Sequence, residues 1–244
     1  MNLVIDIGNT FVKYGVFSGN EEIYSDIAPM PAIGTVQNIC TKHPELGQAI
    51  ISATGNLQDI FVEKCRQLLP KTFVFSAQAL LPYKLHYNTP QTIGLDRLAA
   101  VAGAQTLFPA KNILAIDMGT AITFDLLTSG GIFKGGNISP GMNMRFAALN
   151  HFTHRLPLVN ATDNLPILGK STEQAMQCGV INGIIYEIEG TITEISKNYE
   201  DLTVILTGGD AKFFDNKLKK TIFVVQNLVR TGLNTILNYN APNI

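Results

Sequence analysis

A six-residue pattern occurs twice in this chain of 244 residues, and it is the strongest constraint on its fold. Residues 3–8 read Leu-Val-Ile-Asp-Ile-Gly and residues 114–119 read Leu-Ala-Ile-Asp-Met-Gly, so four of the six positions match. Each copy reads as a buried strand that ends in Asp and Gly, followed by a small polar turn and another strand. Two copies in matching contexts favour a duplicated α/β domain. Two unrelated strand–turn units are the alternative.

Hydrophobic periodicity and turn residues extend this pattern to the rest of the chain. Strands are expected over residues 2–8, 11–18, 22–27, 49–52, 114–119, 122–127, 131–139 and 202–206, and helices over 57–69, 94–107, 142–150, 172–198 and 227–238. We therefore expect two domains, at residues 1–109 and 110–244. Within the long helix, the small residues Ala175, Gly179 and Gly183 predict close packing against another helix.

Composition excludes several classes of protein. Hydrophobic residues make up 46% of the chain and charged residues 15%, with a formal net charge of −1, which argues against disorder and against a nucleic-acid partner. The first apolar stretch is broken by Asp6, and no apolar run approaches the roughly 18 residues of a membrane span. The three cysteines lack the spacing of a zinc site or a disulfide framework. We expect a cytoplasmic protein with no membrane partner.

The first copy of the repeat carries residues suited to a phosphate site. Asp6 ends a strand, and hydrated Mg²⁺ binds proteins through one or two such carboxylates. Gly8 lets phosphate oxygens approach the backbone, Asn9 and Thr10 can donate hydrogen bonds, and Lys13 adds positive charge. The alternative is a plain hairpin in which Asp6 and Asn9 satisfy turn backbone groups.

The second copy, Asp117 to Thr120, has the same donors. Two such loops facing each other would clamp a triphosphate from opposite sides. The turn at 207–210, Thr-Gly-Gly-Asp, follows a strand, and its glycines leave bare backbone for an adenine ring. A glycine-rich strand–helix turn without a ligand is the alternative.

The segment Gly94-Leu95-Asp96-Arg97 lies at an expected helix N-terminus. A carboxylate near a phosphate site is a candidate base for a substrate hydroxyl, and Arg97 can bind a substrate carboxylate with two parallel hydrogen bonds. The alternative is that Asp96 caps its helix and Arg97 lies on the surface.

Two other patterns do not carry a site. Gly169-Lys170-Ser171 lacks the first glycine of a P-loop, because residue 164 is Asn. His151 and His154 lack the spacing and companions of a metal site.

Five motifs in order resemble those of type III pantothenate kinases. They are residues 6–10 with Lys13, residues 94–97, residues 117–120, Ser-Pro-Gly at 139–141 and Thr-Gly-Gly at 207–209. The resemblance covers nearly the whole chain. It implies membership of the acetate and sugar kinase, heat-shock chaperone and actin superfamily, which has two ribonuclease H-like domains and a nucleotide cleft between them.

The resemblance also implies an activity, ATP-dependent phosphorylation of pantothenate to 4'-phosphopantothenate, the first step of coenzyme A biosynthesis. It further implies a homodimer with a substrate pocket completed at the interface. The implied catalytic base is Asp96, and Asp117 would bind a monovalent cation, K⁺ or NH₄⁺. The implied ATP and Mg²⁺ contacts are Asp6, Ile7, Gly8, Asn9, Thr10, Phe11, Val12, Lys13 and Thr120, and the implied pantothenate contacts are Tyr87, Gly94, Leu95, Asp96, Arg97 and Thr172.

Two other functions compete with this one. A non-enzymatic nucleotide-binding regulator can use the same fold. Such a regulator has no need of a carboxylate aimed at an acceptor hydroxyl, so Asp96 separates the two hypotheses. A kinase for a sugar or a short acid is the third hypothesis, and a substrate screen coupled to ADP release distinguishes it.

Overall fold

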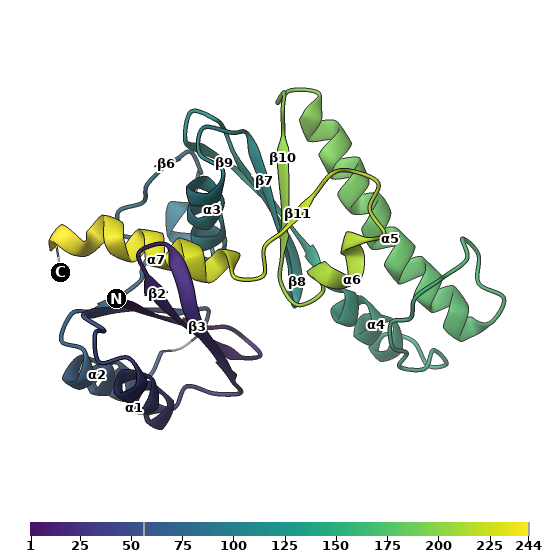
Figure 1. Cartoon of the computed structure of the whole chain (residues 1–244). Helices are drawn as coiled ribbons and strands as arrows, with labels where there is room; N and C mark the ends of the chain where they lie inside the picture. Colours follow the sequence, from purple (N-terminus) through teal and green to yellow (C-terminus); the bar gives the residue numbers. More distant parts are fainter. Residues whose placement is uncertain (56, 244) are drawn as a thin grey trace. The chain divides into compact units, whose positions relative to one another are not determined.

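The computed structural model describes residues 1–55 and 57–243 (Figure 1). Its contacts divide the chain into two compact units. The first unit comprises Met1–Ala110, Ser129–Lys134 and the chain from Asn227 onward, and the second comprises Lys111–Thr128 and Gly135–Gln226. The C-terminal segment therefore belongs by its contacts to the first unit, although it follows the second unit in sequence. The division into domains at 109 and 110 stays a prediction.

The first unit contains a five-stranded sheet in the order β3-β2-β1-β4-β5. The strands β1 (Asn2–Ile7), β2 (Val12–Ser18) and β3 (Glu21–Ala28) form an antiparallel meander, and β4 (Gln48–Ala53) and β5 (Thr72–Val74) continue parallel to β1. Four of these strands lie where the sequence pattern predicts them.

The two faces of this sheet are covered by different helices. Alternate residues such as Leu3, Ile5 and Ile51 pack with α1 (Ile33–Lys42) and α2 (Asp59–Leu68). The intervening residues face α3 (Leu95–Leu107) and α7 (Leu228–Asn240), which lie against each other (Figure 1). The Nδ2 group of Asn2, for example, donates to Oδ1 of Asn234 in α7 at 2.7 Å. Because Asp6 shares the alternation of Asn2, it lies on the α7 face.

The second sheet has the order β11-β10-β7-β8-β9-β6. Its strands are β6 (Lys84–Leu85), β7 (Ile113–Met118), β8 (Ala121–Leu127), β9 (Ile132–Pro140), β10 (Thr203–Thr207) and β11 (Phe223–Val224). Residues of α4 (Met142–His151), α5 (Thr172–Ser196) and α6 (Ala211–Asp215) form a core with alternate residues of β7, β8 and β10. The short 3₁₀ segments Pro90–Thr92 and Ala241–Asn243 complete the list of elements.

Strand order confirms the duplication inferred from the sequence. The series β3-β2-β1-β4-β5 in the first sheet corresponds to β9-β8-β7-β10-β11 in the second. In both, the repeated hexapeptide forms the central strand, with an antiparallel neighbour on one side and a parallel neighbour on the other. The fold is a pair of ribonuclease H-like domains, and the alternative of unrelated strand–turn units is wrong.

One helix of ordinary length escapes the sequence analysis. α1 contains Gly34 and several β-branched residues, which lower helix propensity, and its N-cap residue Ala32 makes no side-chain cap. Its buried residues Val36 and Ile39 pack in the core of the first sheet. Tertiary packing therefore stabilises a helix that local propensity does not indicate.

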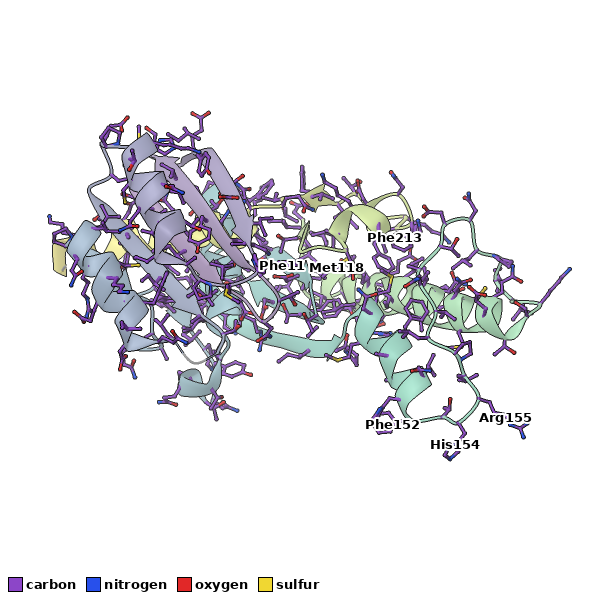
Figure 2. The ribbon with its side chains drawn as sticks, turned by 90° about the horizontal axis from the view of Figure 1, so that it is seen from below. Phe11, Met118, Phe152, His154, Arg155 and Phe213 are labelled. Atoms are coloured by element: carbon purple, nitrogen blue, oxygen red, sulfur yellow. The ribbon has the colours of Figure 1, made fainter. Side chains whose placement is uncertain are left out.

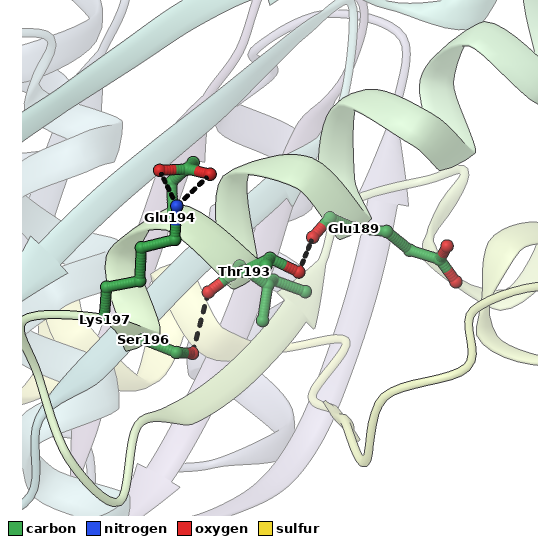
Figure 3. Close-up of polar contacts among 6 residues, drawn as sticks. Glu189, Thr193, Glu194, Ser196 and Lys197 are labelled. Atoms are coloured by element: carbon green, nitrogen blue, oxygen red, sulfur yellow. Dashed lines mark hydrogen bonds and ion pairs between the residues drawn. The ribbon is translucent and has the colours of Figure 1, made fainter.

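The long helix α5 begins at a capped residue, since Oγ of Ser171 accepts a hydrogen bond from the Gln174 backbone N–H. Near its C-terminus, Oγ1 of Thr193 donates to the Glu189 carbonyl at 2.7 Å, and Lys197 pairs with Glu194 (Figure 3). This polar end is consistent with exposure to solvent. In the described part of the chain, no helix is both long and apolar enough to cross a membrane.

Within the described chain, no helix packs closely on Gly179 or Gly183, so the close packing predicted for the small residues of α5 stays a prediction. A Cβ added at Gly179 would meet no atom within 4 Å, and one at Gly183 would meet only the end of Arg145. Instead Ala175, Gly179 and Gly183 line an open groove together with Leu168 and other apolar residues.

Candidate active site

Asp6 lies at the end of β1 and is only 7% exposed. Burial raises the pKa of its carboxyl to about 6, Lys13 and Arg230 oppose that rise, and Asp96 adds to it. Lys13 is the neighbour of Asp6 in the register of β1 and β2, so both side chains lie on the same face of the sheet. A buried carboxylate with a lysine beside it is suited to a bound cation or phosphate.

The turn that follows Asp6 is tight and is supported by a neighbouring loop. The Gly8 backbone N–H donates to the Phe11 carbonyl at 3.0 Å. Thr54, just after β4, donates its backbone N–H to the Ile7 carbonyl at 3.0 Å and can donate its hydroxyl to Oδ1 of Asn9 at 3.3 Å. Sequence analysis did not identify Thr54, because only the parallel pairing of β1 and β4 brings it to this turn.

The other residues of this segment differ in what they offer a ligand. Asn9, Thr10 and Phe11 are exposed, and Figure 2 marks Phe11. Ile7 and Val12 contribute their side chains to the core on the α1 and α2 side of the sheet. The side chains of these two residues are therefore not available to phosphate oxygens.

The segment Gly94–Arg97 forms the start of α3, as predicted. Gly94 is the N-cap residue, and Oδ1 of the half-buried Asp96 accepts a hydrogen bond from the Arg97 backbone N–H at 2.9 Å. Arg97 is only 4% exposed, so the alternative that places it on the surface is wrong. The capping role considered for Asp96 is present in part, since its carboxylate accepts a hydrogen bond from an N–H group of the first helical turn.

In the first unit, Asp96 affects the ionisation of Asp6. Asp96 from α3 contributes to the raised pKa of Asp6 from β1, because two nearby negative charges disfavour ionisation. Tyr87 belongs to the same unit, where its ring lies 6.1 Å from that of Phe133.

Three of the predicted motifs converge in the second unit. Gly208 has a φ of 92°, and a Cβ there would collide with Oδ1 of Asp117. The Gly141 backbone N–H donates to the Thr120 carbonyl at 3.0 Å, and the Asp210 N–H donates to the Met118 carbonyl at 3.0 Å. The turns at 117–120, 139–141 and 207–210 therefore form one cluster. The contacts that join them do not include Thr172, which is exposed at the start of α5.

The sequence analysis missed an ion pair in the first unit. Nε of Arg230 in α7 donates to Oε1 of Glu22 in β3, and Nη2 of Arg230 donates to Oε2 of Glu22 at 3.0 Å. Nδ2 of Asn227 also donates to Oε2 of Glu22, at 2.8 Å. The Arg230 and Glu22 side chains are 11% and 10% exposed. The pair joins residues 208 positions apart, a distance that no local pattern reveals.

Two sequence patterns were rejected as sites, the Gly-Lys-Ser segment at 169–171 and the histidine pair at 151 and 154. Ser171 of the Gly-Lys-Ser segment caps α5. Figure 2 shows Phe152, His154 and Arg155 projecting from the loop after α4. Across residues 1–55 and 57–243, no group of three or more His, Cys, Asp or Glu side chains is placed to hold a metal ion. Mg²⁺ commonly binds a protein through one or two carboxylates and keeps water and phosphate oxygens as its other ligands.

Comparison with known proteins identifies the family of the chain. Residues 2–194 match the model of the type III pantothenate kinase family. A type III pantothenate kinase of Phocaeicola vulgatus is 43% identical over 240 residues, which cover 98% of this chain and 99% of the relative. One from Cytophaga hutchinsonii is 41% identical, with 98% and 100% covered.

A solved structure from Campylobacter jejuni, named as a candidate Baf family transcriptional activator, has a TM-score of 0.62 at 21% identity and covers 99% and 100% of the two chains. That likeness shows the fold alone. The motif order, the duplicated sheets and the full-length relatives lead to one conclusion: the chain belongs to the type III pantothenate kinase family, which phosphorylates pantothenate with ATP in coenzyme A biosynthesis.

Proposed function

We propose that Asp96 is the general base of the phosphoryl transfer. It takes the proton of the pantothenate hydroxyl, the hydroxyl oxygen attacks the γ-phosphorus of ATP, and the bond from that phosphorus to the bridging oxygen of ADP breaks. Two observations support this role: Asp96 lies in the first turn of α3, and its negative charge helps to raise the pKa of the Asp6 carboxyl in the proposed phosphate site. In this proposal Gly94, Leu95, Arg97, Tyr87 and Thr172 contact pantothenate, with Arg97 binding its carboxylate.

The segment from Asp6 to Lys13 is the proposed site for the ATP phosphates. The residues fit ATP with a divalent ion, because the Asp6 carboxylate is a hard oxygen ligand and Lys13 is next to it in the sheet. The exposed Asn9 and Thr10 add side-chain donors. The divalent ion neutralises charge on the phosphates. Thr120 is the proposed further contact to ATP, and placing the nucleotide between the two domains stays a prediction.

Asp117 is the proposed ligand of a monovalent cation, K⁺ or NH₄⁺. Support comes from the close approach of Gly208 to Oδ1 of Asp117 and from the turns at 139–141 and 207–210, which hydrogen-bond to the turn at 117–120. Carbonyl and carboxylate oxygens are the ligands that hard cations prefer.

A homodimer is the proposed assembly, and the groove on α5 is the proposed surface for a second copy. Leu168 is 80% exposed, Ile167 is 78% exposed and Tyr186 is 60% exposed around that groove. Small residues on its floor allow a helix of a second copy to approach closely. Sedimentation of the wild type and of Gly179→Glu tests this surface, since a monomeric variant supports it and an unchanged dimer contradicts it. A cytoplasmic location is proposed because ATP is available there.

An ADP-release assay tests the proposed roles together. The assay is run with and without pantothenate, in K⁺, NH₄⁺ or a large organic cation. We expect ADP release that depends on pantothenate and on K⁺ or NH₄⁺. Loss of the K⁺ dependence in Asp117→Asn, with the fold intact, supports the cation site. Equal activity in the organic cation contradicts it.

A further inference from the structure

Ser52 is a buried polar residue that the proposed mechanism does not use. It lies in β4, is 1% exposed, and its hydroxyl has no hydrogen-bond partner among the described residues. A buried hydroxyl without a partner costs free energy, so a native protein rarely keeps one without a reason. Alanine would fill nearly the same space without this cost.

The register of the sheet places Ser52 beside the proposed phosphate site. Ser52 pairs with Asp6 across the parallel strands β4 and β1, and Asp6 pairs with Lys13 across β1 and β2. Residues paired in this way direct their side chains to the same face. Lys13, Asp6 and Ser52 therefore form one row across three strands, on the face covered by α3 and α7.

The duplicated sheet repeats this arrangement. In the second unit Asp117 pairs with Thr207 across the parallel strands β7 and β10, and with Thr123 across the antiparallel strands β7 and β8. Thr207 is 2% exposed. In both units the parallel neighbour of the strand-end aspartate is thus a buried residue with a hydroxyl group. A packing accident would not be expected at the same register of both sheets.

We propose that Ser52 is a positioning residue of the nucleotide site, whose hydroxyl donates a hydrogen bond to an oxygen atom that enters with Mg²⁺·ATP. The oxygen belongs either to a phosphate or to water on the metal ion. This inference rests on the proposed phosphate site at Asp6. It explains why the hydroxyl is unpaired in the ligand-free protein, since its partner arrives with the nucleotide.

The test compares ligand-free stability with nucleotide binding in Ser52→Ala. We expect an unchanged or raised Tm without ligand, and a Kd for Mg²⁺·ATP, measured without pantothenate, that rises roughly 5- to 50-fold. Ser52→Thr keeps the hydroxyl and should bind within a few-fold of the wild type. Binding of Mn²⁺ without ATP separates the two sources of the oxygen. If Ser52 donates to water on the metal ion, Ser52→Ala should bind Mn²⁺ more weakly than the wild type. If Ser52 donates to a phosphate, the two proteins should bind Mn²⁺ equally.

Thr72→Val is the matched control. Thr72 lies on the neighbouring strand β5, is also buried, and donates its hydroxyl to the Leu69 carbonyl at 2.6 Å. This variant should have a lower Tm than the wild type and the same Kd for Mg²⁺·ATP. The inference is overturned if Ser52→Ala binds Mg²⁺·ATP like the wild type, or if it loses as much Tm as Thr72→Val. If Asp6→Asn also binds Mg²⁺·ATP normally, the phosphate site itself is wrong.

Discussion

Gly103 of α3 and Gly232 of α7 lie against each other with no room for a side chain. A Cβ added at Gly232 would come within 2.8 Å of the Gly103 nitrogen and would collide with the Ala99 carbonyl. A Cβ at Gly103 would collide with the Leu228 carbonyl. The two helix backbones therefore touch, and α7 fixes the position of the helix whose first turn carries Asp96.

Replacing Gly232 by alanine should separate these helices. We expect the free energy of unfolding to fall by roughly 1–3 kcal/mol from overpacking, and kcat to fall because α3 shifts. Denaturant unfolding measures the first effect. Gly190→Ala is the control, since Gly190 lies in α5 with no atom within 4 Å of the added Cβ. The free energy of unfolding of that variant should rise by up to about 1 kcal/mol. Equal stability of Gly232→Ala and the wild type would refute the close contact.

The ionisation of Asp6 should make ligand-free stability depend on pH. Burial raises its pKa from 3.8 to about 6 in the folded protein, so this group favours folding when protonated. Its contribution is complete below pH 3.8 and is lost as the pH rises through 6. Asp6→Asn should therefore be more stable than the wild type at pH 8, by at most about 3 kcal/mol, with a smaller advantage at pH 4.5. Chemical denaturation at both pH values measures the difference, and a less stable variant at pH 8 contradicts it.

Removing only one charge of the Glu22–Arg230 pair should lower the stability of the fold more than removing both. Glu22→Gln leaves the guanidinium of Arg230 buried without its counter-charge, and we expect a loss of roughly 3 kcal/mol or more. Arg230→Met together with Glu22→Gln removes both charges and should lose less than the two single variants combined. A double-mutant cycle measures the coupling. Strictly additive losses would show that the two side chains act independently.

Asp96→Asn should lower kcat roughly 10²- to 10⁴-fold while Mg²⁺·ATP binding is largely kept. The amide keeps the shape of the side chain but cannot accept the proton. Asp59→Asn is the matched control, because Asp59 also lies in the first turn of a helix, α2, and is exposed. Steady-state kinetics of both variants provide the readout. Wild-type turnover in Asp96→Asn removes the assignment of the base.

Most of the fold could be predicted from the sequence because the signals that define it are local. The repeated Ile-Asp-x-Gly strands predicted the duplication, and alternation predicted most strands around them. α1 was missed because its stability comes from the burial of Val36 and Ile39, which depends on tertiary contacts. The short strands β5, β6 and β11, with two or three residues each, are too brief for a periodic pattern.

The candidate site is recognisable in the sequence where its motifs are contiguous, and it is hidden where strand pairing brings its residues together. Residues 6–13, 94–97 and 117–120 are recognisable as segments. Ser52, Thr54 and Arg230 reach Asp6 or its turn only through strand pairing or helix docking. The burial of Arg97 was equally invisible, because it depends on the chain that packs around the start of α3.

Transfer of label from [γ-³²P]ATP to pantothenate tests the central claim most directly. The wild type should move the label onto pantothenate to give labelled 4'-phosphopantothenate, and Asp96→Asn should do so far more slowly. Label that stays in ATP with pantothenate present, or that moves instead to a sugar or short-acid hydroxyl, would contradict the account.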